Sequence, residues 1–198
     1  MKRFEEMKFN IPALKGISEK NIEEHLKLYA GYVKHANLIL KHIDELVSNT
    51  EKYTYELGEL QRRFAFEFDG MRNHEYYFAS FEGSPKRLSE SSELKKAVVA
   101  EWSSFDSFLN RFTVIALTRG IGWAMLYYDQ KTKRLLTQWV DEQHLGHLAT
   151  CQIVLALDMW EHAYVADYQP SGKKNYVEDF FANINWGVIE KNFDSAVR

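Results

Sequence analysis

The sequence predicts an α+β protein in which an N-terminal antiparallel helical hairpin precedes an α/β domain with a small three-stranded antiparallel sheet. Through two long segments of the first third, apolar residues recur at three- and four-residue steps, which is typical of amphipathic helices. After the Gly83-Ser84-Pro85 break, shorter helical patterns alternate with apolar runs of strand length. We therefore predict a helical hairpin domain at residues 1–85 and an α/β domain at residues 86–198.

The N-terminal domain is predicted to contain two long helices. The first begins after Ser18, a favourable N-cap, and its apolar positions continue to about Val47. The polar Ser48-Asn49-Thr50 segment interrupts this pattern, and the second helix runs from about Tyr55 to Phe81. Because the connection is short, we expect the two helices to form an antiparallel hairpin.

The C-terminal domain is predicted to mix helices with three strands. The first two strands are Trp123–Tyr128 and Leu135–Val140, separated by a polar turn, and the third is the apolar run that ends at Asp158. Helical patterns cover residues 93–101, 105–117, 161–168, 175–184 and 186–193. This order of elements is typical of an α+β fold.

Composition narrows the class of protein. The hydrophobic fraction of 45% and the charged fraction of 27% are ordinary for a globular chain. The net charge is −3 and there is no long basic run, so we expect no nucleic-acid partner. Cys151 is the only cysteine, which excludes an intramolecular disulfide, and no apolar stretch is long enough to cross a membrane. A cytoplasmic protein without a membrane partner is therefore expected.

The most informative motif is Asp158-Met159-Trp160-Glu161-His162-Ala163-Tyr164, directly after the third predicted strand. An ionised Asp158 at the end of a buried strand is costly unless a cation neutralises it. Asp158 and His162, four positions apart, are suitable ligands for that cation. The alternative is that Asp158 caps a helix and His162 only packs, and the flanking Trp160, Glu161 and Tyr164 argue against it.

Two histidines of the N-terminal domain complete a candidate metal site. His74 lies on an aromatic helix face, and His25 lies near the start of the first long helix. Either histidine alone would be interpreted as a hydrogen-bonded core residue. Together with Asp158 and His162, they supply three imidazoles and one carboxylate from both domains. Mixed nitrogen and oxygen ligands suit iron or manganese, and a lone cysteine does not favour a structural zinc site.

These motifs, in this order, resemble the iron/manganese superoxide dismutase family across nearly the whole chain. The matching stretches are residues 9–14, 17–25, 32–34, 73–74, 104–108, 122–123, 158–164 and 183–186. The resemblance implies that the protein converts superoxide to oxygen and hydrogen peroxide with one manganese or iron ion cycling between +3 and +2. It also implies that the metal ligands are His25, His74, Asp158 and His162.

The ligand from the first helix requires a choice between two neighbours. The family's histidine lies eight residues before the tyrosine at the substrate entrance, here Tyr32, and that spacing selects Glu24. The preceding Ile22-Glu23 context selects His25 instead, and a one-residue deletion reconciles the two. Seven helical steps bring His25 to within about 20° of the face of Tyr32. We therefore predict His25, with Glu24 as the alternative.

The resemblance also implies two catalytic residues outside the ligand set. Tyr32 would stand at the substrate entrance, and Gln143 would hydrogen-bond solvent at the metal. Gly70, four residues before His74, leaves space for an amide arriving from Gln143, an arrangement that resembles manganese-type members of the family more than iron-type ones. His144 is the alternative to Gln143, and otherwise His144 and His147 are expected at the surface.

Other residues would surround the site or extend it. Trp123, Trp160 and Trp186 would wall the metal pocket, and Glu161 would reach a metal-site histidine of a partner subunit, which implies a homodimer or homotetramer. Tyr164 would lose its usual histidine link, because Leu28-Tyr29 replaces the family's His-His pair and Tyr29 is best interpreted as a core aromatic. Four basic residues either belong to a positive funnel for the anionic substrate or are ordinary surface charges: Lys27, Lys34, Arg72 and Lys173.

Two other functions fit parts of this pattern. A catalytically silent structural or binding protein could use the same fold, but we would expect it to have lost the ligand motif that this chain retains. A hydrolase would need an open metal position and a dedicated general base. No spare carboxylate is evident near the predicted ligands. Superoxide dismutase is therefore the predicted function.

Overall fold

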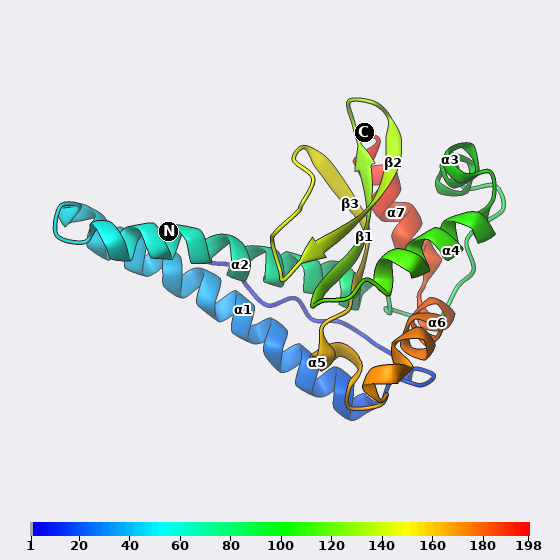
Figure 1. Cartoon of the computed structure of the whole chain (residues 1–198), viewed down its shortest axis with the longest axis horizontal. Coiled ribbons are helices and arrows are strands. Elements are labelled where there is room, and N and C mark those ends of the chain that lie inside the picture. Colours follow the sequence, from blue (N-terminus) through cyan, green and yellow to red (C-terminus); the bar gives the residue numbers. More distant parts are fainter. Residues whose placement is uncertain (1) are drawn as a thin grey trace.

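A computed structural model describes residues 2–198 and confirms the predicted fold class. Helix α1 (Glu19–Leu46) and helix α2 (Thr54–Ala79) lie side by side as a long antiparallel hairpin that projects from the rest of the molecule (Figure 1). The side chain of Ser18 accepts a hydrogen bond from the backbone N–H of Asn21, which is the predicted N-cap of α1. A single 3₁₀ turn, Val47–Asn49, begins the short connection between the helices.

The C-terminal part is built around a three-stranded antiparallel sheet. Its strands are β1 (Gly122–Asp129), β2 (Arg134–Asp141) and β3 (Cys151–Asp158), in the order β2-β1-β3. The central strand is buried along nearly its whole length. Trp123 near the start of β1 pairs with Val140 on one side and with Asp158 on the other. This register brings the last residues of β2 and of β3 to the same end of the sheet, on either side of the start of β1.

Helices cover the sheet and connect it to the hairpin (Figure 1). They are α3 (Glu93–Trp102), α4 (Phe105–Ala116), α5 (Glu161–Tyr164), α6 (Lys173–Asn183) and α7 (Trp186–Ala196). The packing of α2 against β3, and of α1 against α5, joins the two parts through one continuous hydrophobic core. The domain boundary at residue 85 stays a prediction.

Helix α5 corrects the sequence prediction, because it ends at Tyr164 and not at Tyr168. The carboxylate of Asp167 accepts hydrogen bonds from the backbone N–H of Ser18 and the side-chain amide of Asn21, both at 2.9 Å. These bonds hold the chain against the start of α1. The residues from Val165 onward form a turn that follows these remote contacts and not the helix axis.

No helix within residues 2–198 combines the length and the apolar composition that a membrane crossing requires.

Candidate metal centre

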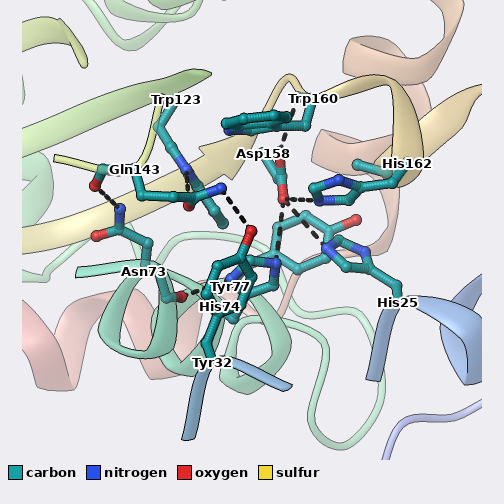
Figure 2. A network of polar contacts seen from close by, with 12 residues as sticks. His25, Tyr32, Asn73, His74, Tyr77, Trp123, Gln143, Asp158, Trp160 and His162 are labelled. Atoms are coloured by element: carbon teal, nitrogen blue, oxygen red, sulfur yellow. Dashed lines mark hydrogen bonds and ion pairs between the residues drawn. The ribbon is translucent and has the colours of Figure 1, made fainter. Parts of the chain in front are cut away.

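Four side chains from both parts of the molecule meet in one buried cluster (Figure 2). The Nε2 atoms of His25 and His162 each lie 3.1 Å from Oδ2 of Asp158, and Nε2 of His74 lies 3.5 Å from the same oxygen. The four candidate ligand atoms are all within 4.8 Å of one another. Three imidazole nitrogens and a carboxylate oxygen facing one point form a donor set suited to one metal ion.

Each ligand candidate is positioned by the end or the face of a regular element. His25 lies on the inner face of α1, His74 on that of α2, and Asp158 is the last residue of β3. Oδ1 of Asp158 accepts a hydrogen bond from the backbone N–H of Trp160 at 2.8 Å, which turns the chain into α5. Oδ2 is thereby left facing the histidines. His162 follows within the first turn of α5.

The hydrogen bonds of His74 determine which ring nitrogen is free. Its Nδ1 lies 2.6 Å from the backbone carbonyl oxygen of Gly70. Because a carbonyl oxygen can only accept, Nδ1 carries the proton and Nε2 presents its lone pair to the cluster. That Nε2 is buried and has no hydrogen-bond partner among the described residues. A buried polar atom without a partner is costly, and a metal ion at this point would satisfy it.

The protonation states of the cluster also fit a cation. Burial lowers the pKa of His25, and burial together with repulsion from His25 lowers the pKa of His74 to about 3. Burial by itself would raise the pKa of Asp158, but the charges and hydrogen bonds of His162 and His25 outweigh it and hold that pKa far below its ordinary value. Neutral imidazoles, as at His25 and His74, and an ionised carboxylate, as at Asp158, are the forms in which these residue types bind metals.

The structure separates the two candidates for the ligand from the first helix. The side chain of His25 is fully buried in the cluster, whereas that of Glu24 is 62% exposed and pairs with Lys27 at 2.6 Å. Helix α1 is an uninterrupted α-helix through this region, so seven residues place His25 and Tyr32 on the same face. Glu24 therefore lies outside the cluster.

A second polar group adjoins the cluster at the predicted catalytic residues (Figure 2). Oε1 of the buried Gln143 accepts a hydrogen bond from Nε1 of Trp123 at 2.9 Å. An indole N–H can only donate, so this contact fixes the orientation of the amide, and Nε2 of Gln143 donates to the hydroxyl of Tyr32 at 2.9 Å. Burial, and then the negative charge of Asp158, raise the pKa of Tyr32. Tyr32 consequently keeps its proton.

Gly70 is required by the ring of Tyr32. A Cβ atom at position 70 would lie 2.7 Å from Cδ1 and 2.8 Å from Cε1 of Tyr32. The predicted open space at Gly70 is thus occupied by the tyrosine ring, and Gln143 reaches the hydroxyl at its end.

We expect the Gly70→Ala variant to keep its metal content and to lose about tenfold in turnover. Alanine favours a helix by about 1 kcal/mol over glycine, but the forced movement of Tyr32 costs about 1–3 kcal/mol. The displaced ring should break the hydrogen bond to Gln143. Metal analysis and a superoxide-removal assay would check this. Gly58→Ala is the matched control, because a Cβ there meets nothing within 4 Å. Equal turnover in both variants would contradict the prediction.

Aromatic rings enclose the cluster, and one of the three predicted tryptophans is absent from it. The rings of Trp123 and Trp160 lie 5.0 Å from His74 and 5.7 Å from His162, measured between centroids. Trp186 packs instead against the aromatic rings of α4 and α6, because its backbone N–H donates to the carbonyl oxygen of Lys86 and ties the start of α7 there. The expectation that Trp186 walls the metal pocket is therefore not met.

Two aromatic residues outside the predicted site take part in the wall. The rings of Tyr77 and Phe78 lie 5.0 and 4.9 Å from that of His25. The hydroxyl of Tyr77 also contacts that of Tyr176, which donates to the backbone carbonyl oxygen of Asp158 at 2.9 Å. Their spacing of three and four residues after His74 was the available signal, since such positions share a helix face.

Glu161, which was predicted to reach a partner subunit, differs in exposure from Tyr164 and Tyr29. Glu161 is exposed, whereas Tyr164 is buried with its ring 5.5 Å from that of Tyr176. Tyr29 is a core residue, as interpreted from the sequence: its hydroxyl accepts from the backbone N–H of Met7 and contacts Glu75.

The four basic residues considered for a substrate funnel differ in their surroundings. Lys27 and Arg72 pair with Glu24 and Glu75, each at 2.6 Å, so their charges are locally balanced. The ammonium group of Lys173 lies 5.7 Å from the ring centroid of Tyr164. Lys34 is exposed on α1.

Asp69 carries a pH-dependent cost to stability. It lies on α2, and burial raises its pKa to about 6 from an ordinary value of 3.8. Above pH 6 the folded protein holds a carboxylate where charge is disfavoured, so folding is less favourable than with a neutral side chain. As the pH falls through 6 toward 3.8, the folded state binds the proton first and stability is regained.

We expect Asp69→Asn to raise the melting temperature by about 3 °C at pH 7.5, which corresponds to about 1 kcal/mol after allowance for partial exposure. The gain should shrink by pH 5 and disappear below about pH 4. Thermal melts across this range would measure it. Asp44→Asn, an exposed replacement on α1, is the control and should show no such pH dependence. A gain from Asp69→Asn that is constant with pH would contradict the assignment.

The fold and the cluster define a protein built to hold one metal ion between a helical hairpin and an α/β domain. The family model "Iron/manganese superoxide dismutases, C-terminal domain" matches residues 90–192. The chain is 36% identical over 188 residues to the iron superoxide dismutase of Cupriavidus metallidurans, an alignment that covers 93% of this chain and 92% of that protein.

Other relatives carry either metal in their names. The chain is 30% identical over 181 residues to the iron superoxide dismutase of Methanothermobacter marburgensis, covering 90% and 88% of the two chains. It is 31% identical over 192 residues to the mitochondrial manganese superoxide dismutase of Glossina morsitans morsitans, covering 95% and 87%. The chain therefore belongs to the iron/manganese superoxide dismutase family.

Proposed function

We propose that this protein is a superoxide dismutase that holds one manganese or iron ion through His25, His74, Asp158 and His162. Two superoxide anions and two protons become one molecule of oxygen and one of hydrogen peroxide. The convergence of three buried donors and the half-buried His162 on one point, beside the Gln143–Tyr32 pair, carries this proposal. When bound, the ion supplies the one-electron redox chemistry by alternating between +3 and +2.

The chain's own residues hold and donate protons. Tyr32 accepts a hydrogen bond from Gln143, so its own O–H remains available to donate, and burial keeps that proton on the oxygen at neutral pH. Trp123 holds the other end of the Gln143 amide. A fixed donor beside a reacting anion lowers the cost of proton delivery, because little reorganisation is needed at the moment of reaction.

Manganese is the metal we propose for full activity. The support is the pairing of Gly70 with an amide that arrives from the loop after β2. This arrangement resembles the manganese-type members of the family more than the iron-type ones. The Gln143 amide is buried and held by hydrogen bonds to Trp123 and Tyr32, so it presents a fixed dipole to the site. Such outer groups adjust the reduction potential of a bound metal and thereby decide which metal works.

Metal loading followed by activity measurement tests both the dismutase function and the choice of manganese. The protein would be stripped of metal, loaded separately with manganese and with iron, and assayed for superoxide removal per bound ion. We expect activity in the manganese form and less in the iron form. Higher activity with iron would overturn the choice of manganese. If both fully loaded forms failed to remove superoxide, the dismutase assignment would be wrong.

We also propose that the protein forms a homodimer through the face that carries Glu161. The support is a solvent-exposed carboxylate directly beside His162, placed to reach the site of a second copy. Sedimentation should give twice the chain mass of 23.3 kDa. The Glu161→Ala variant should shift that equilibrium toward monomer, and a wild-type protein that stays monomeric at micromolar concentration would contradict the proposal.

A further inference from the structure

A histidine in the loop between β2 and β3 connects the central strand to the backbone of Gln143. Nδ1 of His147 is hydrogen-bonded to the hydroxyl of Tyr127 on β1. Its other nitrogen, Nε2, lies 3.1 Å from the backbone carbonyl oxygen of Gln143. His147 is half-buried, and Tyr127 is almost completely buried. This histidine is thus an interior connector and not the surface residue that the sequence indicated.

The partners of His147 determine its tautomer. The carbonyl oxygen of Gln143 can only accept, so Nε2 carries the proton and donates. Nδ1 of the neutral ring is then an acceptor for the O–H of Tyr127. Burial lowers the pKa of His147, which agrees with a neutral ring at physiological pH. Both ring nitrogens are therefore satisfied in one defined orientation.

The carbonyl of Gln143 is held from two sides. Nδ2 of Asn73 donates to it from α2 at 2.9 Å, a contact visible in Figure 2, and His147 donates from the loop. The two bonds use both lone pairs of the oxygen. Backbone hydrogen bonds between Asp141 and Leu145 close the surrounding loop, in which Glu142 and Gly146 adopt positive φ values of 51° and 104°. At the tip of this loop, the two side-chain donors hold the backbone of Gln143 itself.

Strand β1 consequently holds both ends of Gln143. Trp123 binds the side-chain amide, and Tyr127, through His147, holds the backbone. Trp123 and Tyr127 are four residues apart on one strand, so their side chains leave the same face of the sheet. A rigid strand that fixes two points of one loop residue fixes the direction in which its side chain extends.

We propose that His147 is a positioning residue that sets the Gln143 amide against Trp123 and Tyr32. Its effect on turnover rests on the proposed function, whereas its effect on the Trp123–Gln143 hydrogen bond does not. Removal of the imidazole leaves Asn73 as the remaining side-chain donor to the Gln143 carbonyl. The loop can then rotate, and the amide loses its alignment with both partners.

The test measures hydrogen exchange at the indole Nε1–H of Trp123 in the full chain loaded with zinc, a diamagnetic ion that binds the same ligand types. The signal is identified by its loss in Trp123→Phe. We expect His147→Ala to accelerate this exchange about tenfold and to lower turnover of the manganese-loaded enzyme about tenfold. His147→Gln, which retains an N–H donor at a similar reach, should restore both to within about threefold of wild type.

Two further variants make the result specific. His144→Ala removes the neighbouring imidazole, whose Nδ1 has no hydrogen-bond partner among residues 2–198, and should leave Trp123 exchange within about twofold of wild type. Tyr127→Phe removes only the hydroxyl that holds Nδ1 and should accelerate the exchange about threefold. It serves as the decisive variant should His147→Ala not fold.

Three outcomes separate the inference from its alternatives. Unchanged Trp123 exchange in folded His147→Ala, or in Tyr127→Phe, overturns the positioning role. Equal acceleration at all five tryptophans also overturns it, because it indicates general destabilisation. If the exchange pattern is as expected but wild-type enzyme loaded with manganese or iron does not remove superoxide, the positioning role stands and the dismutase function fails.

Discussion

Replacing Asp158 with alanine is expected to empty the metal site and to reduce dismutase turnover by about a hundredfold or more. Its Oδ2 is the atom that all three histidine Nε2 atoms face, at 3.1, 3.1 and 3.5 Å. It is also the only negative charge in the cluster, and a buried cation without it would be unpaired. Metal analysis and superoxide removal, both after manganese or iron loading, would measure the loss.

A second substitution separates the charge of Asp158 from its role in the fold. Asp158→Asn keeps an oxygen that can accept from the backbone N–H of Trp160, so the turn into α5 should survive. We expect this variant to fold with near-native circular dichroism and still to bind metal poorly. Asp194→Ala, an exposed change on α7, should be indistinguishable from wild type. Full metal occupancy in Asp158→Asn would show that the carboxylate charge is not needed.

The second large loss of metal and turnover is expected on replacing His25, whereas replacing its neighbour Glu24 should have little effect. His25→Ala should lower metal occupancy and turnover at least tenfold, because it removes a fully buried imidazole, one of three in the cluster. Glu24→Ala should stay within about twofold of wild type, because exposed ion pairs such as Glu24–Lys27 contribute little. Parallel metal loading, metal analysis and activity assays would compare the two variants.

The opposite result has a clear meaning. An empty site in Glu24→Ala, together with an occupied site in His25→Ala, would mean that α1 presents a different face in solution. The uninterrupted helix between His25 and Tyr32 would then be wrong. His25→Gln distinguishes a lost ligand from a collapsed core, because it conserves most of the volume. It should fold normally and still bind metal weakly.

Several features of the fold followed from local sequence patterns. The periodicity of apolar residues predicted α1 and α2 to within a few residues, since an amphipathic helix repeats its apolar face at 3.6-residue spacing. The three strands were predicted in the same way from short apolar runs and turns. Helix α5 ended early because Asp167 bonds Ser18 and Asn21, which are remote in sequence.

The aromatic wall shows where local patterns are insufficient. Nothing in the local sequence distinguishes Trp186 from Trp123 and Trp160. Only the hydrogen bond from the start of α7 to Lys86 and the packing of α7 place Trp186 among the rings of α4 and α6. The same limit applies to His147. Its neighbours in sequence are those of an exposed loop, whereas its partner Tyr127 lies twenty residues away on β1.

By itself the sequence determined the family, the helical hairpin, the sheet and the residue types that meet at the cluster, because these depend on periodicity and on a specific motif. The tertiary structure decided which nitrogen of His74 is free, which way the Gln143 amide points and which rings enclose the site. Those properties depend on hydrogen bonds between remote elements, since a donor or acceptor is defined by the group that it meets in the folded chain.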